Sequence, residues 1–204
     1  MNKYKKEIEL VIFDLGKVIL DFDHMITCRK LAEYSKRDST FIYDFIFKSG
    51  LEENYEKGKI SSRQLFEAVS DKIGLKMSFK DFNLAWSDIF SLNKGIDQLV
   101  SWVKTKAKTA ILSNTDEMHF NYIRDKYEII NDFDFTFLSY EIGYMKPEKE
   151  IFEYAVSKAG ILPRRIIFID DIQEFACAAN KSGINGICFK DVYSLRKELE
   201  DYFK

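Results

Sequence analysis

The stretch I-E-L-V-I-F-D-L-G-K-V, residues 8–18, decides the fold of this chain. Its first part, Ile8 to Phe13, is apolar except for one glutamate, and the run ends at Asp14. A short apolar run that ends at a charged residue is typical of a strand buried on both faces of a parallel sheet. The stretch therefore predicts the first strand of an α/β sheet, with the carboxylate of Asp14 at its carboxyl end.

Four further apolar runs of similar length follow: Thr109 to Leu112, Phe135 to Leu138, Ile166 to Ile169, and Gly186 to Phe189. Segments with helical spacing separate them, at Asp116 to Tyr127, Lys149 to Ala159, and Phe175 to Ser182. This alternation predicts a doubly wound α/β fold with a mostly parallel, five-stranded, Rossmann-like sheet. Ligands of such sheets bind at the carboxyl ends of the strands, so functional residues are expected there.

The segment from Asp23 to Ser91 has a different pattern. Its apolar residues recur at helical spacing, it contains no convincing strand, and Ser61 with Gln64 forms a capping-box signature. We therefore expect four or five helices that leave the sheet after its first strand and return to it. The predicted domains are an α/β core domain, residues 1–22 and 92–204, and an all-helical cap domain, residues 23–91.

Composition narrows the class of protein. The chain has 204 residues, 46% apolar and 31% charged, as in soluble globular proteins. Its net charge of −2 gives no basic surface for nucleic acid or an anionic membrane, and no run approaches the ~20 apolar residues of a membrane span. Three widely spaced cysteines fit reduced thiols, and the polar start carries no signal peptide. We expect a cytoplasmic protein without nucleic-acid or membrane partners; no pattern indicates its oligomeric state.

Polar side chains follow three of the predicted strands. Asp14 follows the first, Ser113 and Asn114 follow the second, and Asp170 and Asp171 follow the fourth. Each is an ordinary turn residue when considered alone. Because the carboxyl ends of parallel strands open on one edge of the sheet, however, we expect these side chains to surround one small volume.

Lys146 precedes Pro147 in the connection after the third strand. Alone, it is typical of a solvated lysine ahead of a helix with proline in its first turn. Placed at the sheet edge, its ammonium would offset the repulsion between Asp170 and Asp171. Three carboxylates at one edge also call for a hard cation with oxygen ligands, and Mg²⁺ is the usual one.

Four motifs then stand in order: F-D-L-G-K-V, L-S-N-T, K-P within Tyr144 to Ile151, and F-I-D-D-I-Q-E-F. Together they resemble the motifs of the haloacid dehalogenase (HAD)-like hydrolase superfamily over essentially the whole chain. The helical insertion resembles its mobile C1-type cap, which would supply specificity. Candidate contacts to the leaving group are Lys48, Glu52 and Tyr55. The F-D-L-G-x-V form resembles the branch that contains α-D-glucose-1-phosphate phosphatases.

The resemblance implies a role for each residue at the sheet edge. Asp14 would be the nucleophile that attacks phosphorus, Ser113 and Asn114 would bind the phosphoryl group, and Lys146 would neutralise charge. The implied metal ligands are Asp14, the carbonyl of Gly16 and Asp171. Asp170 would either bind the metal itself or contact a residue that does. The implied activity is a magnesium-dependent phosphatase that hydrolyses a small phosphorylated metabolite, such as a sugar phosphate, through an aspartyl-phosphate on Asp14.

Two positions depart from the family pattern. Most phosphatases of the superfamily carry a second aspartate, the general acid and base, two residues after the nucleophile, and here this position is Gly16. The candidates to replace it are Asp21, Asp23, His24 and a water molecule. Many relatives carry Asp or Asn four residues after Asp171, whereas this chain has Phe175, with Glu174 beside it as an alternative oxygen donor.

Two other functions are compatible with the same fold. A metal-independent 2-haloacid dehalogenase also lacks the second aspartate, but the pair Asp170 and Asp171 would then place uncompensated charge beside Asp14. A non-catalytic binding module is suggested by Gly16 and Phe175. Folding alone, however, does not require several charged groups at one sheet edge.

Overall fold

The structure is a computed structural model that describes residues 7–204, so the predicted start of the core domain, residues 1–6, lies outside it. Its main sheet has the strand order β5-β4-β1-β6-β7, with all strands parallel. The strands are β1 (Leu10–Phe13), β4 (Lys108–Ser113), β5 (Phe135–Leu138), β6 (Ile166–Asp170) and β7 (Asn185–Cys188). The ladder continues past β1, because the N–H of Asp14 donates to the carbonyl of Ile169 at 2.8 Å. Asp14 is thereby placed beside the carboxyl end of β6.

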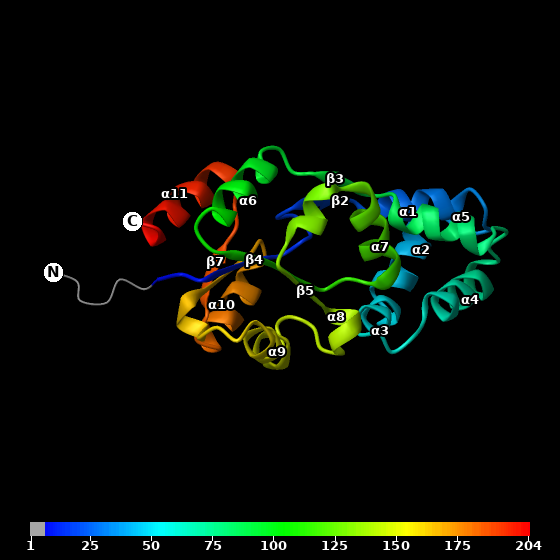
Figure 1. Cartoon of the computed structure of the whole chain (residues 1–204). Helices are drawn as coiled ribbons and strands as arrows, with labels where there is room; N and C mark the ends of the chain where they lie inside the picture. Colours follow the sequence, from blue (N-terminus) through cyan, green and yellow to red (C-terminus); the bar gives the residue numbers. More distant parts are fainter. Residues whose placement is uncertain (1–6) are drawn as a thin grey trace.

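Five helices cover the two faces of this sheet: α6 (Ile96–Lys104), α7 (Glu117–Lys126) and α11 (Val192–Tyr202) on one, and α9 (Lys149–Ala159) and α10 (Gln173–Lys181) on the other. In β1, Val11 and Phe13 pack into the first layer, while Leu10 and Ile12 pack into the second. All four side chains are fully buried, which explains the continuous apolar run. The predicted doubly wound, five-stranded α/β fold is confirmed (Figure 1).

The expected helical insertion is also present. It contains α1 (His24–Ala32), α2 (Ser39–Phe47), α3 (Leu51–Glu56), α4 (Ser62–Ile73) and α5 (Phe79–Ser87), which gather at one end of the molecule in Figure 1. The predicted capping box forms, since the Ser61 N–H donates to Gln64 Oε1 at 2.9 Å and the Gln64 N–H donates to Ser61 Oγ at 3.2 Å. The helices enclose a hydrophobic cluster of their own, which includes Tyr55, Trp86 and one core residue, Met118.

A second, two-stranded sheet was not predicted. In it β2 (Leu20–Phe22) pairs antiparallel with β3 (Phe90–Leu92), so the expectation of no strand within 23–91 is wrong for the residues at its end, Phe90 and Ser91. Strands of three residues are too short to show alternation in the sequence. This β2–β3 ribbon joins the segment that enters the cap to the segment that leaves it. It lies beside both predicted domain boundaries, and the division into two domains stays a prediction.

Three short segments complete the described part of the core: η1 (Glu128–Asp132), α8 (Ser139–Ile142) and η2 (Pro163–Arg165). Within residues 7–204, no helix combines the length and the apolar character that crossing a membrane requires.

Candidate active site

Lys146 lies between two carboxylates at the carboxyl edge of the sheet. Its Nζ is 2.8 Å from Asp14 Oδ1 and 2.6 Å from Asp170 Oδ2. All three residues are buried, with Asp170 completely inaccessible. Because a buried charge is tolerated only when it is paired, the ammonium of Lys146 compensates the two carboxylates. The structure thus brings the side chains of Asp14, Lys146 and Asp170 together, as predicted.

The side chain of Asn114 fixes the main chain of Lys146. Asn114 Nδ2 donates to the carbonyl of Lys146 at 3.0 Å, and the N–H of Lys146 donates to Asn114 Oδ1 at 2.8 Å. The ring centroids of Phe168 and Phe175 lie 5.5 and 5.3 Å, respectively, from Lys146 Nζ. The amide of Asn114, which the sequence suggested for orienting a phosphoryl group, thus orients the lysine. Phe175, the departure in the last motif, contributes an aromatic contact to the same ammonium.

Electrostatics at the site follow from burial. Burial raises the pKa of Asp14 to about 7, against the effects of Lys146 and of the Leu15 N–H, and the charge of Asp170 adds to the increase. Burial would lower the pKa of Lys146, but Asp14 and Asp170 outweigh it and the pKa is raised. The lysine therefore stays charged, and its charge favours the ionised form of Asp14 that nucleophilic attack requires.

Asp14, Asp170 and Asp171 form an acidic cluster. Each offers one carboxylate oxygen, and these oxygens lie within 4.8 Å of one another. Burial, followed by the charge of Asp170, raises the pKa of Asp171. A set of hard oxygen donors at this spacing fits Mg²⁺ better than a softer ion. The exposed Glu174 lies outside this cluster, on a cavity beside Pro147 and Lys149, so it does not supply the oxygen that Phe175 lacks.

Ser113 ends β4, the strand next to β1, and is buried at the same sheet edge. Its hydroxyl donates to the carbonyl of Asn114 at 3.2 Å. Gly16 lies in the loop after Asp14, where its carbonyl accepts the Val18 N–H at 2.7 Å. A carbonyl oxygen has two lone pairs, so that of Gly16 retains one for a further partner.

The place of the missing second aspartate is occupied by Phe22. A Cβ atom added at Gly16 would lie 2.8 Å from Phe22 Cε1, closer than carbon atoms approach in real structures. Of the downstream candidates, Asp21 pairs with Lys17 at 2.5 Å. Asp23 accepts the N–H of Met25 as the N-cap of α1 and pairs with an arginine. Both aspartates are exposed and paired with local partners.

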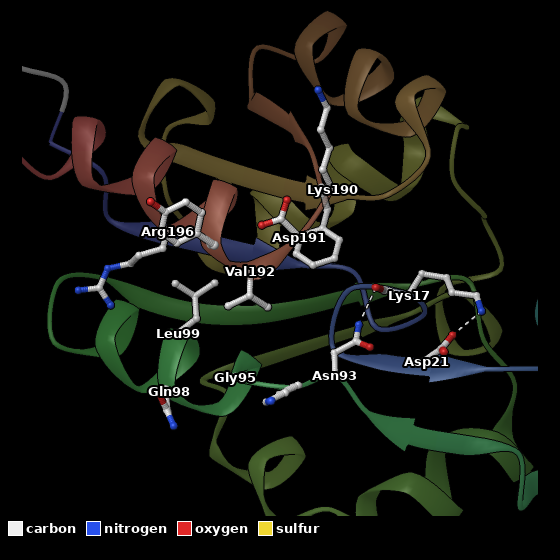
Figure 2. A pocket seen from close by; sticks show the side chains of 13 residues that line it. Lys17, Asp21, Asn93, Gly95, Gln98, Leu99, Lys190, Asp191, Val192 and Arg196 are labelled. Atoms are coloured by element: carbon white, nitrogen blue, oxygen red, sulfur yellow. Dashed lines mark hydrogen bonds and ion pairs between the residues drawn. The ribbon is translucent and has the colours of Figure 1, made fainter.

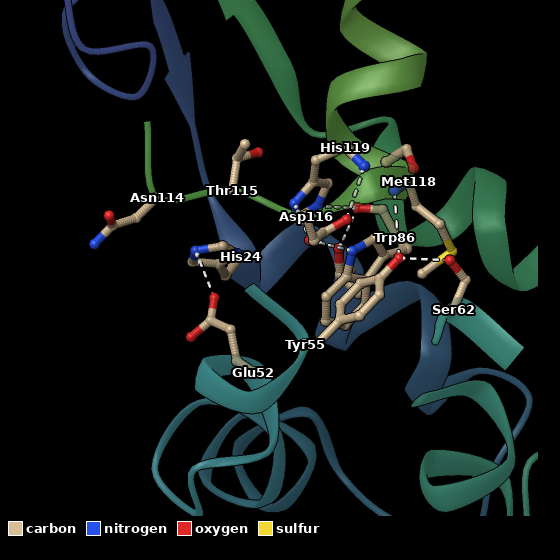
Figure 3. Close-up of polar contacts among 12 residues, drawn as sticks. His24, Glu52, Tyr55, Ser62, Trp86, Asn114, Thr115, Asp116, Met118 and His119 are labelled. Carbon is tan, nitrogen blue, oxygen red and sulfur yellow. Dashed lines mark hydrogen bonds and ion pairs between the residues drawn. The ribbon is translucent and has the colours of Figure 1, made fainter. Parts of the chain in front are cut away.

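His24 lies where the cap meets the core. Its Nε2 is 3.7 Å from Glu52 Oε1, while its buried Nδ1 has no hydrogen-bond partner among the described residues (Figure 3). Burial, and then the nearby charge of His119, lowers the pKa of His24 to about 4, and burial raises that of Glu52 to about 7. Of the other proposed cap contacts, Tyr55 is buried in the cap, and Lys48 is exposed and pairs with an aspartate of its own helix.

A buried pair that the sequence analysis missed joins the cap to the core. Asp116 Oδ2 lies 2.7 Å from His119 Nδ1 and accepts the indole N–H of Trp86 at 3.0 Å. The other ring nitrogen of His119 lies 3.1 Å from the carbonyl of Trp86. Since a carboxylate and a carbonyl only accept hydrogen bonds, both ring nitrogens carry protons. The sequence pattern that could have indicated this pair is an aspartate at a helix N-cap followed three residues later by a histidine.

A cavity of about 830 Å³ lies apart from the acidic cluster (Figure 2). Lys17, Lys190 and Arg196 line it, near the N-terminal ends of α6 and α11, whereas none of the acidic cluster does. Asn93 borders it and holds the loop after Asp14, because its Nδ2 donates to the carbonyl of Lys17 at 2.7 Å.

The structure therefore brings a buried aspartate, a lysine and further carboxylates together at the carboxyl edge of a parallel sheet. The model of the haloacid dehalogenase-like hydrolase family matches residues 8–183. The chain therefore belongs to this family, and the predicted family and enzyme class are confirmed.

Several relatives resemble the chain over most of its length. A D-ribitol-5-phosphate phosphatase of Bacteroides thetaiotaomicron is 25% identical over 173 residues, which cover 80% of this chain and 83% of that protein. A crystal structure of a HAD family enzyme from the same organism, in complex with magnesium and inorganic phosphate, matches with a TM-score of 0.81 at 25% identity and covers 91% of this chain and 96% of the other. L-2-haloacid dehalogenase from Xanthobacter autotrophicus shares the fold, with a TM-score of 0.64 at 16% identity, over 95% of this chain and 83% of its own.

Proposed function

We propose that this protein is a magnesium-dependent phosphatase that hydrolyses a small phosphate monoester with Asp14 as its nucleophile. The observation that carries the proposal is the position of Lys146 between Asp14 and Asp170, with Asp171 completing the acidic cluster. In a metal-independent dehalogenase Lys146 alone would have to balance three carboxylates, which would leave negative charge uncompensated beside Asp14. The similar enzyme that binds magnesium and phosphate, and the similar phosphatase, support the same reaction class.

The contacts of Asp14 support different roles for its two oxygens. Oδ1 accepts the Leu15 N–H at 2.7 Å and faces Lys146 Nζ, which fixes the carboxylate. The other oxygen is then the one that attacks phosphorus. The bond between phosphorus and the ester oxygen breaks, an aspartyl-phosphate forms, and water releases inorganic phosphate from it in a second step. Lys146 offsets negative charge on the phosphoryl group, and Ser113 donates a hydrogen bond to one of its oxygens.

Mg²⁺ would be held by Asp14, Asp171 and the carbonyl of Gly16. Asp170 would either bind the ion itself or contact one of its ligands. When bound, it supplies positive charge that stabilises the phosphoryl oxygens as their charge develops. Asn114 contributes indirectly, because it holds the main chain of Lys146.

The substrate class that we propose is a small phosphorylated metabolite, with sugar and polyol phosphates first among the candidates because of the similar D-ribitol-5-phosphate phosphatase. We also propose that residues 23–91 act as a mobile cap over a core of residues 1–22 and 92–204, which the separate hydrophobic cluster of the cap supports. A cytoplasmic location is supported by the free thiols of the three cysteines.

The test is a panel of phosphate monoesters, assayed with magnesium and with a chelator in its place. We expect magnesium-dependent phosphate release that is abolished in Asp14→Asn and retained in the control Asp21→Asn, an exposed aspartate of β2. Chloride release from a 2-haloacid without metal would identify a dehalogenase instead. No turnover on any ester, together with no magnesium binding by calorimetry, would identify a binding module.

A further inference from the structure

The turn that follows α3 is fastened to the core segment that carries Lys146. Lys57 Nζ lies 3.0 Å from Glu148 Oε1, and Glu148 Oε2 in turn accepts the Met145 N–H at 2.8 Å. At Gly58 the two backbones approach so closely that an added Cβ would lie 2.2 Å from the carbonyl oxygen of Tyr140. Only glycine fits this contact, so the end of α3 is seated directly against α8, as Figure 1 shows.

Tyr55 fastens the same segment from its other side. Its hydroxyl lies 2.8 Å from Ser62 Oγ and accepts the N–H of Met118, at the start of α7, at 3.3 Å (Figure 3). Residues 55, 57 and 58 are therefore all held by the core or by groups bound to it. Glu56, the last residue of α3, lies between them and is therefore held next to the core.

Glu56 is half-buried, and its carboxyl group forms no hydrogen bond or ion pair with any residue in the range 7–204. The charged groups that act on it are Glu52 of α3, Asp116 before α7, Lys146 before α9, and Asp14 after β1. Three of these four groups are carboxylates, so a proton on Glu56 relieves repulsion. Burial first, and then these carboxylates, raise the pKa of Glu56 well above its ordinary value.

The other candidates for proton transfer are excluded by their surroundings. Phe22 fills the space beside Gly16, and Asp21 and Asp23 are exposed and paired. His24 packs between aromatic rings, and its lowered pKa leaves it without a second proton at neutral pH. Glu52 lies 3.7 Å from His24 Nε2, which leaves Glu56 as the unpaired cap acid on which the charges of both Asp14 and Lys146 act.

We propose that Glu56 is the general acid and base of this enzyme, contributed by the cap in place of the family's second aspartate. The inference rests on the proposed phosphatase function. In the first step, as an Asp14 oxygen bonds to phosphorus and the phosphorus–ester oxygen bond breaks, the Glu56 proton moves to the ester oxygen, which leaves as an alcohol. In the second step the Glu56 carboxylate takes a proton from the water that attacks phosphorus. Phosphate leaves, and Asp14 and the protonated Glu56 are regenerated.

Leaving groups that differ in their need for a proton test this role. An alkoxide must be protonated as it departs, whereas a nitrophenolate leaves without a proton. In Glu56→Gln we expect turnover of glycerol phosphate to fall by about 10²- to 10⁴-fold, while the first step with para-nitrophenyl phosphate, measured as the burst of nitrophenol, falls by less than about tenfold. The matched control is Glu67→Gln, which removes an exposed carboxylate from α4 of the cap and leaves both rates unchanged.

Two further measurements separate chemistry from folding. Glu56→Ala should recover part of its glycerol phosphate turnover when formate is added, because a small acid can occupy the space of the lost carboxyl group. Equal losses on the two esters without rescue by formate, or no loss on glycerol phosphate, would overturn the assignment. If the wild-type enzyme hydrolyses neither ester nor any member of the phosphate panel, the proposed function has failed instead.

Discussion

Replacing Gly16 by aspartate restores the family's usual residue, yet we expect it to destabilise this protein. The backbone at Gly16 is outside the left-handed region, so the cost comes from space alone. The new Cβ would stand 2.8 Å from Phe22 Cε1, whereas carbon atoms in contact lie about 3.5–4.0 Å apart, so the ring must move by roughly 1 Å. Overpacking of this kind costs about 1–3 kcal/mol of unfolding free energy.

The assay is urea unfolding of Gly16→Asp, Phe22→Ala and the double variant, analysed as a double-mutant cycle. If the ring is the obstacle, the cost of Gly16→Asp nearly disappears when Phe22 is alanine, which gives a coupling free energy of about 1–3 kcal/mol. Gly16→Ala serves as the control, because it adds the same Cβ without a charge and should cost a similar amount. Additive effects, or a stable Gly16→Asp protein, would refute the steric explanation.

Three further predictions follow from the buried contacts. Lys146→Met leaves two carboxylates without their partner and should lower the unfolding free energy by about 3–5 kcal/mol, whereas the exposed Lys149→Met should change it by less than about 0.5 kcal/mol in the same urea assay. Asn114→Ala releases the main chain of Lys146, so steady-state kinetics should show kcat reduced by up to about 10²-fold; an unchanged kcat would contradict the positioning role. His119 stabilises the protein through Asp116, which outweighs burial and raises the pKa of the histidine. This contribution is complete below the unfolded pKa of about 6.5 and is lost as pH rises through the higher folded pKa. The difference in unfolding free energy between wild type and His119→Asn should therefore shrink with rising pH. A difference that stays constant would argue against a charged His119.

The strands that carry the site could be predicted because burial on both faces of the sheet requires a continuous apolar run in the sequence. Every side chain of β1 enters one of the two cores, and the apolar run therefore stops where Asp14 meets the edge. The parallel arrangement then brings the strand ends together, so the meeting of Asp14 and Asp170 follows from topology. Metal preference follows from the type of ligand alone.

Contacts between distant residues could not be predicted in the same way. Asn114 holds the main chain of Lys146 across 32 positions, and nothing in either residue's neighbourhood encodes this partnership. The obstruction of Gly16 by Phe22 depends on how the β2–β3 ribbon folds back. Glu56 gives no periodic signal, because its position depends on the contacts of Lys57 and Gly58 with the core.

The central claim is that Asp14 becomes phosphorylated during turnover. The direct measurement is to quench the enzyme with acid while it hydrolyses a substrate in the presence of magnesium, reduce it with borohydride, which converts an aspartyl-phosphate to homoserine, and locate the change by peptide mass spectrometry. We predict homoserine at position 14 in the wild-type enzyme, dependent on both substrate and magnesium. Phosphate release with position 14 unmodified and another residue carrying the phosphoryl group would contradict the mechanism.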